Sequence, residues 1–291
     1  MWWGFELEFK SSLRAKKLWV ILGIMILFYI PGFYLAKSQG ISVEDLGGAL
    51  GILIDNINSS AGFFIAILAL LIGATAINSE IEKGTLRIAM SKPVRRISYI
   101  GGKFMAHVTI LLIALLFSTV IGIIGLLLLG TPFSWRLLTE SLILNLLLLL
   151  AMVQLVALGY ILSTYIKSST TALGVALAVF FVLFLILPSI VQFIAISDYI
   201  GNPDQPINWE EVQGRIKEYT TRYLFYVPTQ QVKLIVGDAF RISGGIMNPE
   251  REYIGLSHAI GKNVLNLGIL VGLTGVYLAV AFYRFLRMDL R

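Results

Sequence analysis

Charged residues gather in one stretch of an otherwise apolar chain, residues 79–96. The stretch contains two glutamates, five Lys or Arg residues, one glycine and one proline. Because ionised side chains are costly to place in hydrocarbon, the stretch must lie in water between two membrane spans. Paired charge of both signs is suited to docking, so recognition of another protein is the chemistry that this stretch favours.

Other kinds of chemistry lack the residues they need. The two histidines, His107 and His258, are expected on opposite sides of a membrane, so they cannot share a metal ion. Both Gly-Lys pairs of the chain lack the remaining glycine and the Ser or Thr of a phosphate-binding loop. Cysteine is absent, which excludes disulfides and thiolate metal sites. We therefore predict no catalytic residue, cofactor site or metal site, and no ATPase activity of this chain itself.

Composition indicates an all-α integral membrane protein. Of the 291 residues, 57% are hydrophobic and only 14% are charged, whereas about 25% are charged in a soluble domain. The apolar runs are continuous instead of alternating, which favours helices over barrel strands. The six predicted spans cover residues 18–36, 61–78, 104–130, 142–166, 171–197 and 264–283.

None of these six spans contains Asp, Glu, Lys or Arg, and His107 is their one residue of the acid–base type. Carriers that are driven by protons or ions place such groups inside the membrane. The sequence therefore indicates that any transport draws its energy from outside this chain.

The distribution of positive charge predicts the orientation. Fourteen Lys and Arg residues lie in the N-terminal segment, the loops after the second and fourth spans, and the C-terminal tail, against two in the short loops on the other side. By the positive-inside rule, both termini and residues 79–103 are cytoplasmic in a multi-pass protein of the plasma membrane. The net charge of +6 thus reflects topology and attraction to anionic lipid, and gives no reason to expect nucleic acid.

The first 17 residues are predicted to form an interfacial helix. Trp2, Phe5, Phe9 and Leu13 fall on one helical stripe, so the helix can lie on membrane lipid. The alternative is a basic flank that only fixes orientation. On the outer side, Glu140 lies before the fourth span.

The largest outer feature is residues 198–263, which we expect to form an external helical cap. Asn208 and Glu211 make a capping box, and an apolar stripe follows up to Pro228. A second helix is expected over 230–240, and Asn248-Pro249 can begin a third. The cap either gates a pathway or rests on lipid headgroups. Pro31 and Pro188 are expected to kink the outer halves of the first and fifth spans.

Residues 79–103 are predicted to form a rigid cytoplasmic segment. Ser79 and Glu82 can make a capping box that starts a helix, Gly84 permits close backbone approach, and Pro93 ends the helix. The alternative is a solvated hairpin whose basic residues only enforce topology.

The order of residues here resembles a known pattern. Glu80 and Glu82-Lys83-Gly84-Thr85-Leu86, then Ser91-Lys92-Pro93-Val94-Arg95-Arg96 and Gly102-Lys103, are similar to the motif after the second span in permeases of type-2 ABC transporters. The whole chain resembles these permeases in its six spans, N-terminal interfacial helix and external helices.

This resemblance implies a permease subunit of an ABC exporter that forms the substrate pathway. A second permease copy, or a related permease, would complete that pathway, and a separate cytoplasmic ATPase would bind ATP and Mg²⁺ and drive it. Lipids, drugs and hydrophobic peptides are candidate cargoes. The resemblance assigns the ATPase-coupling interface to Glu80, Glu82, Gly84, Thr85, Leu86, Ser91, Pro93, Arg95 and Arg96.

Polar residues inside the spans are candidates for lining the pathway, namely Ser118, Thr119, Asn145 and Gln154. Their alternative role is hydrogen bonding between helices. The alternative function for the whole chain is a membrane channel or scaffold without an ATPase partner.

Overall fold

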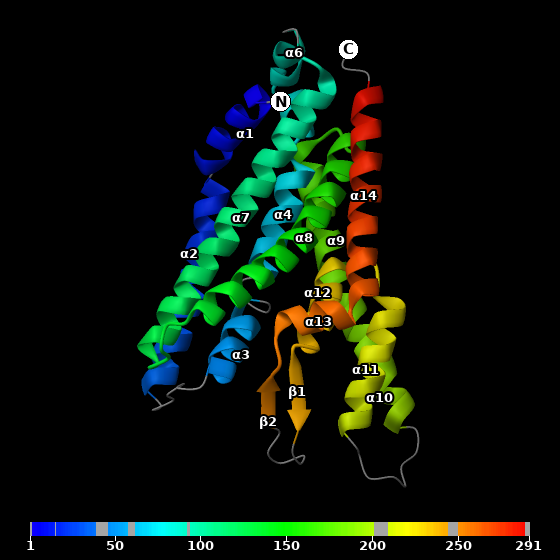
Figure 1. Ribbon diagram of the computed structural model, residues 1–291. Helices are drawn as coiled ribbons and strands as arrows, with labels where there is room; N and C mark the ends of the chain where they lie inside the picture. The colour runs from blue at the N-terminus through cyan, green and yellow to red at the C-terminus, as the bar shows by residue number, and fades with distance from the viewer. Residues whose placement is uncertain are drawn as a thin grey trace.

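The computed structural model describes residues 2–14, 16–38, 46–57, 62–91, 94–200, 209–243 and 250–288. These residues form an elongated bundle of helices (Figure 1). The helix α1, the C-terminal end of α14 and the short helix α6 reach one end of the bundle, here called the α6 end. A β-hairpin reaches toward the opposite end, here called the hairpin end.

Four described helical stretches are long and apolar enough to cross a membrane. They are α7 (Arg96–Leu128), α8 (Trp135–Tyr165), α9 (Ser169–Phe181) with its continuation α10 (Leu187–Ile200), and α14 (Val264–Arg287). They cover the predicted third, fourth, fifth and sixth spans. Hydroxyl caps begin two of them, because Ser134 Oγ accepts from Leu137 N at 3.1 Å and Ser168 Oγ accepts from Thr171 N at 3.4 Å.

The first half of the chain supplies shorter or peripheral helices. The helix α1 (Trp2–Arg14) packs on α7, and the 23-residue helix α2 (Lys16–Ser38) covers the first predicted span. The helix α3 (Leu46–Asn56) precedes α4 (Gly62–Ala74), which has only 13 residues where the sequence predicted a second span. A 13-residue helix is about 20 Å long, short of the roughly 30 Å of hydrocarbon.

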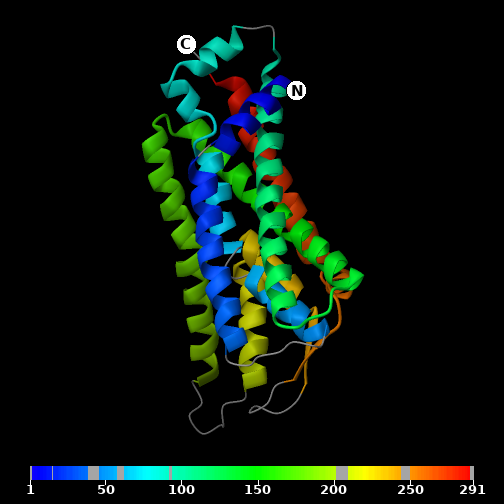
Figure 2. The ribbon, with the colours of Figure 1, turned by 90° about the vertical axis from the view of Figure 1, so that its left-hand side faces the viewer.

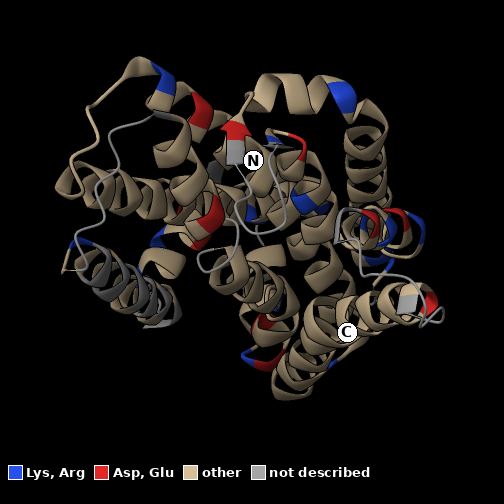
Figure 3. Ribbon diagram, turned by 90° about the horizontal axis from the view of Figure 1, so that it is seen from below, with Lys and Arg blue, Asp and Glu red and all other residues tan. Residues whose placement is uncertain are grey.

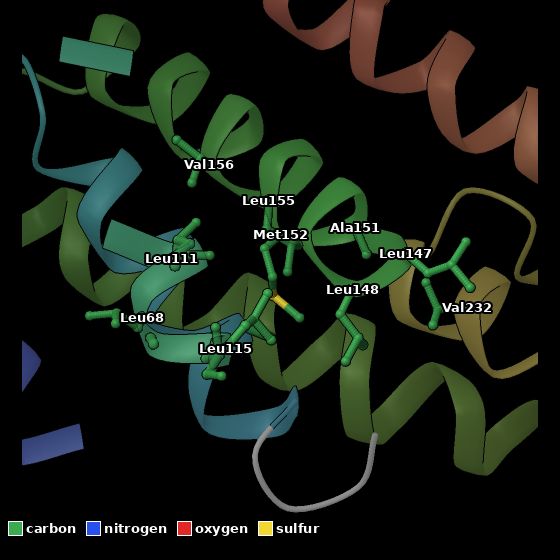
Figure 4. Close-up of a cluster of buried hydrophobic side chains, with 14 of the residues drawn as sticks. Leu68, Leu111, Leu115, Leu147, Leu148, Ala151, Met152, Leu155, Val156 and Val232 are labelled. Atoms are coloured by element: carbon green, nitrogen blue, oxygen red, sulfur yellow. The ribbon is translucent and has the colours of Figure 1, made fainter. Parts of the chain in front are cut away.

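The core lies where α4, α7 and α8 meet. Leu68, Leu111, Leu115 and Met152 point into one apolar cluster (Figure 4). Backbones come close at Gly73, where a Cβ atom would lie 2.5 Å from Val156 O. Glycine therefore allows α4 and α8 to pack closely.

The fifth predicted span contains a π-helical turn, Val182–Ile186, between α9 and α10. Pro188 follows directly in α10 and is buried. Because proline lacks an N–H, Pro188 cannot donate to the hydrogen-bond ladder of the helix at this position. The predicted kink at Pro188 stays a prediction. The chain is also helical through Pro31, whose side chain lies outside the described part.

The region between α10 and α14 differs from the predicted set of three helices. The helices α11 (Trp209–Tyr223), α12 (Pro228–Gly237) and α13 (Leu256–Lys262) are present, and Pro228 occupies the first turn of α12. Strands β1 (Phe240–Ser243) and β2 (Glu250–Tyr253) form an antiparallel hairpin, so the third helix begins at Leu256 and not at Asn248-Pro249, where the sequence predicted its start. Asn208 and the turn at 244–249 lie outside the described residues.

Figures 2 and 3 show the bundle from two further directions. The quarter turn in Figure 2 shows α2 running beside α7 along the bundle, and these two helices are in contact. Most of the ribbon seen from the hairpin end carries neither Lys, Arg, Asp nor Glu (Figure 3). The described residues thus form a helical membrane protein with one small β-hairpin.

Candidate functional site

The charged stretch forms two short helices at the α6 end. They are α5 (Asn78–Glu82) and α6 (Thr85–Met90), separated by Lys83 and Gly84. The predicted Ser79–Glu82 capping box is absent, because Ile77 is the N-cap residue and Ser79 Oγ donates instead to Thr75 O. Pro93 lies outside the described residues.

Gly84 breaks the helix that the sequence predicted to continue. Its φ of 69° is in the left-handed region, and apart from its neighbours in the chain nothing lies within 4 Å of the position a Cβ would take. That Gly84 permits close backbone approach of a docking partner stays a prediction. The glycine is needed for its backbone conformation, which redirects the chain from α5 into α6.

Hydrogen bonds fasten α5 to the end of α8 and the start of α9. Ser163 Oγ accepts from Ile77 N at 2.8 Å and from Asn78 N at 3.1 Å. The Glu82 carboxylate accepts from Ser169 N at 2.8 Å, at the first turn of α9. A carboxylate is stabilised at a helix N-terminus, so Glu82 acts as a cap supplied from another element.

An ion network connects α5 to α1 and α7. Lys103 is only 3% exposed, and its Nζ lies 3.0 Å from Glu8 Oε2 and 2.8 Å from Glu80 Oε1. The same nitrogen donates to Ala76 O at 2.7 Å. All three protons of the buried ammonium therefore have acceptors, which is what a buried charge requires.

His107 and two tyrosines extend this network. His107 Nε2 lies 2.8 Å from Glu8 Oε1, and its Nδ1 lies 3.0 Å from the Tyr160 hydroxyl. Because an ionised carboxylate only accepts, Nε2 carries a proton, and in the neutral ring Nδ1 accepts from Tyr160. The Tyr99 hydroxyl donates to the Glu80 carboxylate at 2.9 Å.

The Glu8 carboxylate stays ionised in this setting. Burial by itself raises its pKa, but the Lys103 ammonium and the His107 hydrogen bond hold the pKa well below its usual range. Glu8 was missed in the sequence because its partners come from a distant helix. The available signal was Lys103 and His107, four residues apart and therefore on one helical face.

A cleft of about 850 Å³ lies at this junction. Residues from α1, α4, α5, α6 and α7 line it, with Glu8, Glu80 and Lys103 on its polar side and Leu68 and Ile110 on its apolar side. The cleft therefore marks where the predicted segment, residues 79–103, meets the helices of the bundle.

The structure brings only some of the predicted interface residues to the surface. Glu82, Thr85, Ser91 and Arg95 are exposed, whereas Leu86 is 1% exposed. Exposed apolar side chains accompany them, with Ile81 at 39% and Ile88 at 66%.

Besides Glu82, two further charged residues of the predicted interface bond within the chain. Glu80 binds Lys103, and Arg96 Nη1 donates to Leu286 O at 3.3 Å and Met288 O at 3.1 Å. The latter bonds tie the start of α7 to the end of α14.

The candidate pathway residues are all buried within the chain. Ser118 is 0% exposed, Thr119 and Asn145 hydrogen-bond to each other at 2.9 to 3.1 Å, and Gln154 Nε2 donates to Tyr226 O at 3.3 Å. Their role in a pathway remains a prediction.

Comparison with known proteins agrees with the resemblance to ABC transporter permeases. A family model described as "ABC-2 family transporter protein" matches residues 2–290. The chain is also 28% identical over 207 residues to "Probable ABC transporter permease protein NosY" of Stutzerimonas stutzeri, which covers 68% of this chain and 71% of that protein. The chain therefore belongs to the ABC-2 family of transporter proteins, as a membrane permease subunit.

Proposed function

We propose that this chain is the permease of an ABC exporter that is driven by a separate cytoplasmic ATPase. The ATPase docks on the exposed part of residues 79–103, and ATP and Mg²⁺ bind to that partner. Lipids, drugs and hydrophobic peptides are the cargo classes. The permease lies in the plasma membrane with both termini in the cytoplasm.

The observation that carries this proposal is the attachment of α5 and α6 to the rest of the bundle. The helix α6 presents Thr85, Arg87 and Ile88 to solvent, while Glu80 and Glu82 on α5 bond to α7 and to the start of α9. Closely packed interiors transmit strain because they are hard to compress. A push on α6 is therefore passed to α1, α7 and α9 together.

The chain has six spans if the two apolar stretches that contain α2 and α4 also cross the membrane. The helix α2 has 23 residues, about 35 Å at 1.5 Å per residue. The helix α4 is short, and the chain continues from it through a turn at residues 75–77 into α5. In this arrangement α1 lies at the membrane surface in contact with lipid.

Uneven burial supports a second permease copy. Within the most apolar windows of the candidate spans, 61% of residues in α8 are buried, against 22% in α9–α10 and 17% in α14. The latter two therefore offer apolar faces to lipid or to another permease. A pair of permeases would give a pathway between them.

Purification tests the proposal directly. The tagged chain is extracted from its source in mild detergent, and the co-purifying proteins are identified by mass spectrometry. We expect an ATP-binding-cassette ATPase in stoichiometric amount, because the complex depends on a specific interface.

Two matched variants locate that interface. Ile88→Asp on α6 should reduce recovery of the ATPase at least tenfold, whereas Phe133→Asp should not, although Phe133 is also well exposed at 58%. If no ATPase co-purifies, a channel or scaffold becomes the better interpretation.

A further inference from the structure

A second, smaller cavity lies far from residues 79–103. It has a volume of about 210 Å³ and is bounded by α8, α9, the π-helical turn, α14 and the start of α12. Leucine, valine and proline side chains form most of its wall, and Tyr226 and Tyr277 complete it. Among the residues that the structure describes, no Asp, Glu, Lys, Arg or His lines this cavity, so its chemistry favours a neutral ligand.

The one amide in the wall has an unused acceptor. Gln154 is 1% exposed, and its Nε2 donates to Tyr226 O at 3.3 Å. Its Oε1 has no hydrogen-bond partner among the described residues. Nearly all buried polar atoms are paired in folded proteins, so an unpaired carbonyl beside a cavity is placed to accept from a donor that enters the cavity.

The backbone next to the cavity is irregular as well. Leu183 lines it from the π-helical turn Val182–Ile186. Such turns are rare and frequently occur at functional sites, because the extra residue displaces a side chain from the regular helical position. The turn and the Gln154 carbonyl thus point to the same place from different helices.

Size limits what can enter. A volume of about 210 Å³ is below the roughly 300–1,000 Å³ of pockets that enclose a drug-sized molecule. The cavity therefore has room for only one end of a molecule of that size or longer.

From these observations we infer that the cavity binds the hydroxyl end of a neutral, lipid-like alcohol. The hydroxyl donates to Gln154 Oε1, and the adjoining carbon chain packs on Leu155, Leu158 and Leu183. Both a bilayer lipid and a transported cargo have this chemistry. Binding needs no ATPase, so this inference stands or fails separately from the proposed function.

Photolabelling of the purified chain in nanodiscs tests the site. The probe is a long-chain alcohol that carries a diazirine and an alkyne, and the comparison probe is its methyl ether, which cannot donate. A net hydrogen bond corresponds to about three- to tenfold in affinity. We expect the alcohol to label the peptides containing residues 155–158 and 179–183 more strongly than the ether by that factor.

Variants assign the difference to Gln154. Gln154→Met should lower alcohol labelling to the level of the ether, and the matched control Gln192→Met, at an exposed glutamine of α10, should leave it unchanged. Leu183→Trp, which keeps Gln154 but fills the cavity, should reduce labelling by both probes. Equal labelling by alcohol and ether in the wild type, or an alcohol preference that survives Gln154→Met, would overturn the inference.

One addition distinguishes the two sources of ligand. Diacylglycerol is included in the nanodisc as a competitor for the probe. Competition shows that a bilayer lipid with a free hydroxyl occupies the site, and labelling that persists assigns the site to an alcohol other than diacylglycerol. Either result supports a site for a neutral alcohol.

Discussion

At the scale of single residues, Lys103 shows how a charge is kept inside the α6 end. It is 3% exposed and contacts two carboxylates, one from α1 and one from α5. Ion pairs of this kind add little stability over apolar packing, but losing one partner is costly because the other charge stays buried. The pair is thus better suited to fixing the position of α1 and α5 than to adding stability.

The variant Glu8→Gln tests this role. It leaves Lys103 with Glu80 as its only carboxylate, and we expect destabilisation of about 3 kcal/mol, the lower end for a broken buried pair. For a chain of this size that corresponds to a fall of about 5–10 °C in the thermal midpoint, measured by size-exclusion chromatography after heating.

Glu6→Gln on the same helix is the control. Glu6 pairs with Lys10 at 2.6 Å, but both side chains are about half exposed, and such surface pairs contribute roughly 0–1 kcal/mol. A Glu8 variant as stable as the Glu6 variant would show that the network does not hold α1 in place.

Residue roles were the least predictable part of the site. The types at Glu80, Glu82 and Arg96 indicated an interface, yet these side chains bond to α7, α9 and α14. Sequence spacing describes neighbours on one helix, whereas these contacts join residues 23 or more positions apart. Gly84 is different, because a glycine between two short helical patterns is itself a signal for a left-handed turn.

At the scale of elements, long apolar helices were predictable and short elements were not. The predicted span 104–130 falls almost wholly in α7, which begins earlier, at Arg96, and ends at Leu128. Helices continue past the hydrocarbon where their backbone hydrogen bonds remain favourable. The strands Phe240–Ser243 and Glu250–Tyr253 have four residues each, too few for a clear alternating pattern. Their pairing depends on the contact of Phe240 with Tyr253, whose rings lie 5.3 Å apart.

Asp238 joins three elements of residues 198–263, the region that the sequence predicts to be an external cap (here called the cap). Its carboxylate accepts from Lys217 of α11 at 2.6 Å and from Asn263, after α13, at 2.8 Å. Burial raises its pKa, but these hydrogen bonds and the nearby lysines have the larger combined effect and lower it. A lowered pKa stabilises the folded cap above the unfolded value, and this contribution is lost as pH falls through the folded value.

We therefore expect the cap to loosen on acidification. Spin labels at Thr221 and Gly261 report the distance between α11 and α13, and its distribution should broaden as the pH falls from about 5 to about 3, below the ordinary pKa of Asp. Asp238→Asn should give the broad distribution already at neutral pH. A distribution that stays narrow in both cases would contradict this role of Asp238.

Glu140 also connects elements that the sequence did not place together. It was expected only to lie on the outer side, but it is 8% exposed and accepts from the Tyr253 hydroxyl at 2.8 Å and Leu256 N at 3.1 Å. It thereby joins α8 to the hairpin and to α13. Its partners come more than 100 residues later in the chain, so no local pattern indicated them.

At the scale of the whole molecule, the α6 end collects the features that the charge distribution assigns to the cytoplasm. The helix α1, the end of α14 and α6 lie together there (Figure 1). This is the arrangement expected if both termini are cytoplasmic.

Cysteine labelling in intact cells checks the orientation, and the chain has no cysteine of its own to interfere. We expect Ser91→Cys to react with an impermeant maleimide only after the membrane is opened, and Phe133→Cys to react in intact cells. The reverse pattern would place residues 79–103 outside and remove the basis for an ATPase partner.

Docking of the ATPase on α6 is the central claim, and a cross-link from this helix tests it most directly. Ile88→Cys, at a position 66% exposed in the wild type, carries a photoreactive maleimide in inside-out vesicles that contain the co-purified ATPase, and Phe133→Cys is the matched control. Docking on α6 predicts a cross-linked product of permease and ATPase from position 88 and none from position 133. An ATPase that co-purifies but forms no product from position 88, or forms it equally from position 133, would contradict docking on α6.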